Sequence, residues 1–390
     1  MTGLMRSASI LLLLAWTVLT VGCSSVAGDD PDTPQPTPGQ PDAPDAELPI
    51  LFSALQQEED TDVTRATSLE DMNVFSFTVW GYKNLNYNDG AYDNLQTVFP
   101  GYTVNWVENS ANTTSSNTHG WEYVNQQTTS DEQTIKYWDW GAKAYRFLAV
   151  TGTVVEDNGG TYEANKAYKA NEANGTKFTF AANCSGATEE AIAANIAAVP
   201  YFSRLWFSTG NVGEYPDRQF GKPVQLEFTK PFARVRFLFN YSYAAEGVRV
   251  TSPNFKPADN EEKIALVGTV TVSYPLTGTA IKESYSVTPK AVPAAGETLN
   301  AFTEEYIPEG TEKWYTVLPA LSQGNYTMNV VVNNNERTAV VPAAYMSWLP
   351  GYSYTYIFKI TEDGGVEIDL VQSAVTPWTE LENDHSANNW

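Results

Sequence analysis

The chain has 390 residues, a length that predicts two domains besides any leader or linker. Lys and Arg number 23 against 46 Asp and Glu, and the net charge of −23 disfavours nucleic acid as a partner, because phosphates would be repelled. Aromatic residues make up 13% and charged residues 18%, a mixture that favours a mostly β protein. Two His and two Cys leave little material for a Cys/His metal site or for a catalytic triad.

The N-terminus has the features of a signal peptide. An apolar run over residues 10–21 follows Arg6 and ends at Gly22 and Cys23. This run is long enough for the apolar region of a signal peptide but too short to span a bilayer as a helix. We therefore expect residues 1–22 to be removed.

The residues around the expected cleavage site resemble a bacterial lipobox. The segment reads Leu19-Thr20-Val21-Gly22-Cys23, with Thr20 where Leu is usual, and in a lipobox the Cys is diacylated before the signal is removed. The sequence therefore predicts Cys23 as the lipid attachment site. Ordinary secretion, with cleavage near Ala27, is the alternative.

Residues 23–65 are expected to form an acidic, Pro-rich stalk and pro-segment. From 24 to 63 the chain is rich in Pro and Asp and contains no Lys or Arg, a composition typical of a solvated, extended stalk. Residues 48–55 (LPILFSAL) are apolar, however, and predict a strand or short helix that docks on the body of the protein.

Beyond Arg65 the apolar residues recur with a period of two, which indicates strands. We expect antiparallel sheets, each with one face in water. The clearest alternating segments are 75–79, 145–150, 224–229, 233–240, 326–332, 352–360 and 366–370.

One helix is predicted after Thr188, a candidate N-cap, because apolar residues then recur at helical spacing before Pro200. The polar loop at 218–222 marks the expected domain boundary. The sequence thus predicts an N-terminal domain over 66–220 and a C-terminal domain over 221–390.

No segment carries an enzymatic or metal-binding motif. The Asn- and Asp-rich stretch 86–93 resembles a calcium loop but lacks its ligand spacing, so a turn is the better interpretation. His119 and His385 lie in polar contexts without the features of a catalytic base. We therefore expect no catalytic residue, no metal and no cofactor.

Two further features have a structural and a functional interpretation. Cys184 has no cationic neighbour in sequence and is expected to pack as a small apolar residue. The segment Tyr137-Trp138-Asp139-Trp140 could stack on sugar rings, but core packing is favoured because further strand aromatics follow it.

Four segments together resemble the fimbrillin-like lipoproteins of Bacteroidales, the subunits of type V pili: 64–83, 121–150, 223–237 and 347–360. The resemblance implies two tandem transthyretin-like antiparallel β-sandwich domains. It also implies a pro-segment that blocks a groove until an Arg-specific protease removes it. Arg65-Ala66 matches the bond cut in the family, although Arg65 as an uncut loop cation stays an alternative.

The resemblance implies a structural, non-enzymatic subunit of a fimbria at the outer membrane and cell surface. Its partners would be other fimbrillin-like subunits, the membrane through the lipid on Cys23, and surface ligands during adhesion. Val366, Ile368 and Leu370 form a terminal strand that could pair within its own sandwich or be donated to a neighbour. The alternative function is a surface glycan-binding lipoprotein of a nutrient-uptake system.

The lipid assignment is testable by replacing Cys23 with Ala. The variant should remain unprocessed or mislocalised, and it should lose labelling by a palmitate analogue, because the acylated sulfur is absent. Labelling that persists in the variant would show that the lipid is attached elsewhere.

Overall fold

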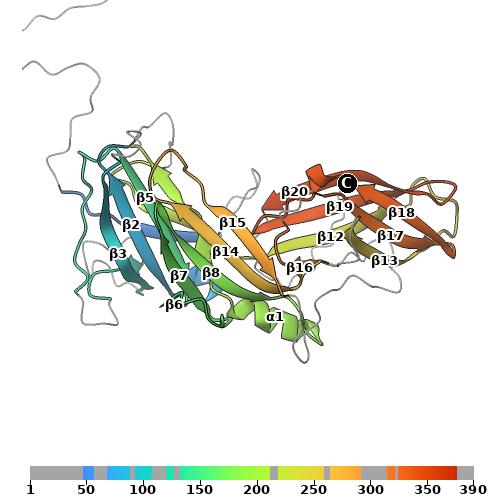
Figure 1. Ribbon diagram of the computed structural model, residues 1–390, viewed down its shortest axis with the longest axis horizontal. Helices are drawn as coiled ribbons and strands as arrows, with labels where there is room; N and C mark the ends of the chain where they lie inside the picture. Colours follow the sequence, from blue (N-terminus) through green and yellow to red (C-terminus); the bar gives the residue numbers. More distant parts are fainter. Residues whose placement is uncertain are drawn as a thin grey trace, which may run out of the picture. The chain divides into compact units, whose positions relative to one another are not determined.

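The computed structural model describes residues 47–56, 68–87, 93–107, 120–126, 132–210, 218–258, 264–290, 314–320 and 324–375 (Figure 1). The described residues belong to one compact unit, Asp45–Trp390. They are mostly β, as the composition predicts. No helix among them is long and apolar enough to cross a membrane. The predicted sites Cys23, Arg65 and Ala66 lie outside the described residues.

The largest sheet has eight strands and is built mainly from the N-terminal half of the chain. Its hydrogen-bonded order is β1-β11-β9-β5-β2-β3-β4, and β10 also pairs with β5. The strands are β1 (Phe52–Gln56), β2 (Ser76–Asn84), β3 (Leu95–Trp106), β4 (Trp121–Glu122), β5 (Ala144–Thr151), β9 (Phe202–Ser203), β10 (Trp206–Ser208) and β11 (Val224–Thr229).

A five-stranded sheet packs on one face of this large sheet. The ring centroids of Trp80 on β2 and Phe178 on β8 lie 5.1 Å apart, and the Tyr274 hydroxyl donates to the Ser203 carbonyl at 2.7 Å. Neighbouring strands β7, β8 and β14 lie side by side in Figure 1. The strands, in sheet order, are β15 (Ser284–Pro289), β14 (Val267–Pro275), β8 (Gly175–Asn183), β7 (Lys166–Glu172) and β6 (Thr153–Glu156).

The C-terminal part contains two smaller sheets that pack through aromatic rings. Phe255 lies with its ring centroid 4.9 Å from that of Phe237 and 5.5 Å from that of Tyr356. One sheet, in order, consists of β16 (Tyr315–Val317), β12 (Ala233–Asn240), β19 (Tyr352–Ile360) and β20 (Val366–Val375). The other consists of β13 (Val250–Pro257), β17 (Tyr326–Val332) and β18 (Asn335–Val341).

The predicted helix is confirmed as α1 (Glu189–Ala198). The Thr188 side chain accepts a hydrogen bond from the Ala191 amide at 3.2 Å, which satisfies one of the free donors of the first turn. Two 3-10 turns, η1 (Glu70–Met72) and η3 (Ala343–Tyr345), complete the described helical elements.

One sequence-based expectation about the sheets is wrong. The sheets are not purely antiparallel, because β1–β11, β6–β7 and β12–β19 are parallel pairs. Strand pairing also crosses residue 221, since β11 pairs with β1 and β9, and β14 pairs with β8.

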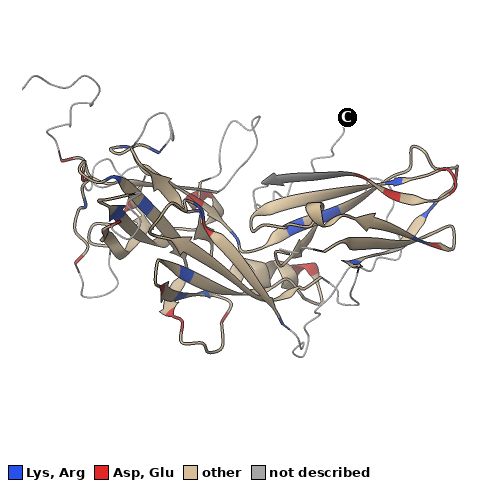
Figure 2. Ribbon diagram, turned by 45° about the horizontal axis from the view of Figure 1, so that its top comes forward, with Lys and Arg blue, Asp and Glu red and all other residues tan. Residues whose placement is uncertain are grey.

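The expectation of one wet face per sheet fails at β5, all of whose residues are buried. Tyr145, Phe147 and Ala149 pack in one apolar core, and Leu148 and Val150 pack in another on the opposite face. Few Lys, Arg, Asp or Glu residues lie on the strands, as the mostly tan ribbon of Figure 2 shows, which is consistent with such two-sided packing.

Arg146 on β5 is fully buried, and both terminal nitrogens of its guanidinium are hydrogen-bonded within the protein, whereas its Nε has no partner. Its guanidinium donates to Asn84 Oδ1 at 2.6 Å and to the Gly278 carbonyl at 2.7 Å, and it lies 4.9 Å from the centroid of the Phe207 ring. Burial lowers the pKa of Arg146. These contacts attach the turn between β14 and β15 to the large sheet, so a residue that seems solvent-facing in sequence is part of the core.

Candidate functional site

The first described strand, β1, docks on the body of the protein, as the apolar stretch 48–55 predicts. Ile50, Phe52 and Ala54 have exposed fractions of 0%, 0% and 1%, whereas Leu51 and Ser53 are only partly buried. The alternation is that of a strand with one face in the core. Complete burial of a Phe side chain contributes about 1.5–3 kcal/mol, so β1 contributes substantially to the core.

One backbone edge of β1 pairs with β11 in parallel. The register places Phe52 beside Val224 and Ala54 beside Leu226. The Val224 amide donates to the Leu51 carbonyl at 2.7 Å. The inward-facing residues of β11 are fully buried as well, so the two strands share one apolar face.

The other backbone edge of β1 is also occupied. The Ile50 amide donates to the Lys136 carbonyl at 2.7 Å, and the Trp138 amide donates to the Leu48 carbonyl at 3.0 Å. Farther along, the Leu69 amide donates to the Ala54 carbonyl at 3.2 Å. Therefore residues 48–56, which end in β1, have backbone partners on both sides, the second side being paired at Leu48, Ile50 and Ala54, although β1 stands at the end of the sheet order.

Phe52 is the centre of an aromatic cluster. Its ring meets those of Phe77, Phe99, Tyr123 and Phe147 edge to face, with centroid separations of 6.4, 5.2, 5.9 and 5.9 Å. Each such pair contributes about 0.5–1.5 kcal/mol beyond the area that it buries. The four partners come from strands β2, β3 and β5 and from the residue after β4, so one side chain of β1 contacts three strands of the large sheet.

Tyr123 joins β1 to the segment on its other side. Its hydroxyl donates to the Ile50 carbonyl at 3.1 Å and accepts from the Lys136 amide at 3.1 Å. Burial raises the pKa of Tyr123 well above its usual value, so the phenol stays protonated and serves as donor and acceptor. Removing residues 48–56 would take away the nearer of its two carbonyl acceptors, Ile50, and leave the Lys136 carbonyl at 3.4 Å.

The surroundings of β1 therefore have the form of a groove filled by a strand. If β1 left, amides of β11, Trp138 and Leu69 would lose their acceptors, and the aromatic cluster would be opened. Another extended chain could restore both sets of contacts by β-augmentation.

The predicted processing bond, Arg65-Ala66, lies in the sequence between β1 and Leu69, which contacts β1. β1 ends at Gln56, before this bond. Leu69 follows the bond, is buried, and donates its amide to the Ala54 carbonyl of β1. A cut between Arg65 and Ala66 would place β1 and Leu69 on separate fragments.

The predicted donor residues lie in a strand that pairs within the chain. Val366 pairs with Ile360, Ile368 with Phe358 and Leu370 with Ile357 in the antiparallel ladder of β19 and β20. Val366 is buried and Ile368 packs partly buried against the core. Of the two possibilities left open by the sequence, this structure has the first, internal pairing.

The aromatic segment before β5 is divided between the core and the surface. Trp138 is only 4% exposed, as the core interpretation predicts, but Tyr137 and Trp140 are 42% and 38% exposed. Asp139 between them forms a 2.5 Å ion pair with Lys83, and this hydrogen bond lowers the pKa of Asp139.

The other candidate residues show no reactive arrangement. Cys184 is buried and packs in an apolar core, as expected, and its burial raises the pKa of the thiol. In the part of the chain that the structure describes, no group of His, Cys, Asp and Glu could hold a metal ion. His119 and His385 lie outside the described residues.

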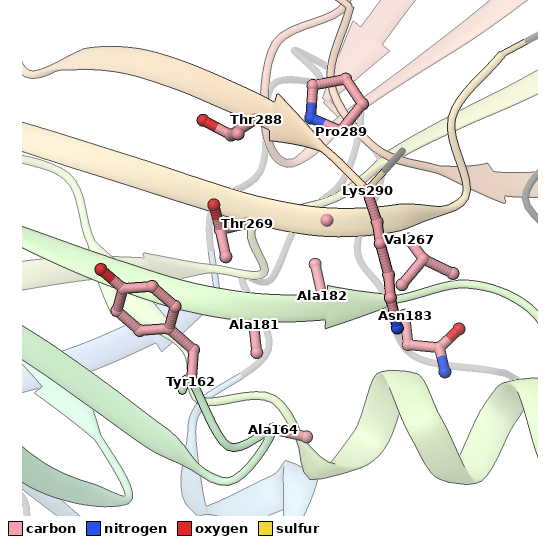
Figure 3. A pocket seen from close by; sticks show the side chains of 11 residues that line it. Tyr162, Ala164, Ala181, Ala182, Asn183, Val267, Thr269, Thr288, Pro289 and Lys290 are labelled. Atoms are coloured by element: carbon pink, nitrogen blue, oxygen red, sulfur yellow. The ribbon is translucent and has the colours of Figure 1, made fainter. Parts of the chain in front are cut away.

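An open pocket of about 510 Å³ lies on the five-stranded sheet. Figure 3 shows Tyr162 and Lys290 on opposite sides of the small residues Ala181 and Ala182, with Asn183 beside Lys290. Tyr162 is oriented by hydrogen bonds from its hydroxyl to the Asp157 carboxylate at 3.2 and 3.3 Å.

Sequence reasoning identified β1 but missed the residues that enclose it. The hydrogen-bonding role of 136–138 and the position of Tyr123 depend on pairings distant in sequence, for which the local pattern carries no signal. The aromatic density of 121–147 is the one local feature that could have indicated them.

No protein-family model and no curated protein matches the chain. Similar solved structures include a fimbrial protein from Bacteroides vulgatus, at 10% identity, 84% coverage of this chain, 99% of that chain and a TM-score of 0.38. A protein from Bacteroides ovatus with a suggested role in cell adhesion has 15% identity, 86% and 99% coverage and a TM-score of 0.37. The fimbrial anchor protein Mfa2 from Porphyromonas gingivalis has 11% identity, 84% and 98% coverage and a TM-score of 0.27. These likenesses are distant, and they are to proteins of the kind that the sequence resembles.

The contribution of Phe52 to the body can be measured directly. Replacing Phe52 with Ala in the full chain should lower the free energy of unfolding by about 3–5 kcal/mol, because a buried ring and its four partners are lost. Phe75→Ala is the matched control, since Phe75 is 49% exposed and its loss should cost about 0.5 kcal/mol or less. Equal unfolding midpoints in urea for the two variants would show that β1 contributes little to the core.

Proposed function

We propose that the chain is a structural subunit of a cell-surface fimbria, exported as a lipoprotein through Cys23 and assembled by protease-triggered strand exchange. The observation that carries the proposal is the complete insertion of β1, with Ile50, Phe52 and Ala54 in the core and both backbone edges paired. A buried strand on the N-terminal side of an Arg-Ala bond fills a groove that a strand of a second chain could occupy after cleavage.

The covalent link between β1 and the body explains why cleavage would act as the switch. While residues 57–65 connect them, β1 rebinds at the high effective concentration of a tethered segment. A cut at Arg65-Ala66 makes rebinding bimolecular, so an incoming strand can compete for the groove. Because many backbone and aromatic contacts must break first, exchange should be slow.

The donor in this scheme is a strand from the C-terminal part of another subunit. In this chain the candidate is β20 with Val366, Ile368 and Leu370, which must leave β19 before it can be donated. The body in this proposal forms two tandem transthyretin-like sandwiches. The first consists of the eight- and five-stranded sheets and the second of the four- and three-stranded sheets.

The role proposed here is non-enzymatic and needs no cofactor. The partners are other fimbrillin-like subunits and the outer membrane, the latter through the lipid on Cys23. The location is the cell surface, where the assembled fimbria supports adhesion to host or bacterial surface ligands.

A glycan-binding surface lipoprotein is the second candidate. The half-exposed rings of Tyr137 and Trp140 favour it, because exposed aromatic faces can stack on sugars. It requires no cleavage and no assembly, so the assembly experiment separates the two functions.

Replacing Arg65 with Ala tests the proposed switch. In a mixture with the other fimbrial subunits of the cells that make it, an Arg-specific protease should convert the wild-type protein from monomers into SDS-resistant ladders, whereas Arg65→Ala should stay monomeric because β1 remains tethered. Gel filtration and unboiled SDS gels before and after treatment are the measurements.

Ala66→Ser is the matched control, since it changes the same bond but keeps the Arg that the protease recognises. It should be cut and should assemble like the wild type. Polymers formed equally well by Arg65→Ala would show that cleavage is not the switch and would favour the glycan-binding role.

A further inference from the structure

The groove around β1 has subsites of different size. Its inward positions hold an aliphatic side chain at Ile50, an aromatic one at Phe52 and a methyl group at Ala54. All three are essentially without solvent exposure, so each subsite is matched to the side chain that fills it.

The central subsite is shaped for a ring. The four rings around Phe52 meet it at interplanar angles between 73° and 86°, so their contacts depend on a flat side chain with an edge and a face. An aliphatic side chain would lose this geometry and leave space that the surrounding rings fill only in part.

The subsite at Ala54 is small and closed. Ala54 stands beside Leu226 of β11, and its carbonyl accepts from the Leu69 amide at 3.2 Å on the opposite edge. Ala54 is only 1% exposed and belongs to the apolar core, so its methyl group is enclosed by protein atoms. A branched side chain here would have to displace packed core atoms.

The chain's own candidate donor strand does not match this order of sizes. Residues 366–375 read VEIDLVQSAV and contain no aromatic residue. Val366, Ile368 and Leu370 would place an aliphatic side chain in the ring subsite and a large one in the methyl subsite.

We propose that this groove selects a strand with the pattern aliphatic-x-aromatic-x-small and rejects the chain's own residues 366–375. The inference rests on the proposed strand exchange and specifies its partner. The strand that replaces β1 comes from a second kind of subunit, one that carries an aromatic residue two positions before a small one.

The test uses the full chain, cut after Arg65, and fluorescently labelled peptides measured by anisotropy. A peptide of residues 47–56 should bind the cut protein, and Ser53→Ala, which changes an outward-facing position, should bind equally well. Phe52→Leu and Ala54→Leu peptides should each bind about tenfold weaker or worse. A peptide of residues 366–375 should bind about a hundredfold weaker, because both mismatches combine.

Binding of the Phe52→Leu peptide or of the 366–375 peptide as tight as that of the 47–56 peptide would overturn the proposal. If no peptide displaces the bound N-terminal segment, the proposal is tested with the same substitutions made in the full chain. After cleavage, Phe52→Leu and Ala54→Leu should release the N-terminal segment at least about tenfold faster than Ser53→Ala. Equal release rates would overturn the proposal.

The outcomes also separate this inference from the proposed function. Selective peptide binding without any SDS-resistant ladder would leave the selectivity standing and refute assembly. Ladder formation together with equal binding of all peptides would support assembly and refute the selectivity.

Discussion

Much of the N-terminal part of this protein depends on Phe52, a residue that precedes the expected processing bond. Its ring contacts four aromatic residues of the large sheet, and the strand that carries it is hydrogen-bonded along both edges. A buried apolar strand of this kind is costly to expose, because its removal uncovers both ring surfaces and backbone amides. The body is therefore complete only while some strand occupies this position.

This dependence connects stability with assembly. A groove that must be filled favours any strand of suitable shape, and the identity of that strand is decided by side-chain fit once the backbone bonds are satisfied. Here the fit is an aromatic ring at Phe52 and a methyl group at Ala54, both without solvent exposure. In the proposed strand exchange, the contacts that stabilise the uncut chain would also determine which partner replaces its own strand.

The sequence predicted local features well and distant pairings poorly. The docking of residues 48–55 and the helix after Thr188 were predictable, because apolar clustering and a side-chain cap are local. The parallel pairing of β1 with β11 was not, because nothing near Phe52 indicates Val224 as its neighbour. Burial of both faces of β5 was missed because Arg146 seems solvent-facing, although its two terminal nitrogens donate to Asn84 and to the Gly278 carbonyl inside the protein.

The most direct test compares the uncut monomer with assembled fibres by hydrogen–deuterium exchange and mass spectrometry. The account predicts that amides of β11 are protected in both states, while the peptide containing Phe52 is present in the monomer and absent from the fibre. Fibres that retain residues 47–56, or whose β11 amides exchange freely, would contradict the claim that another strand fills the groove.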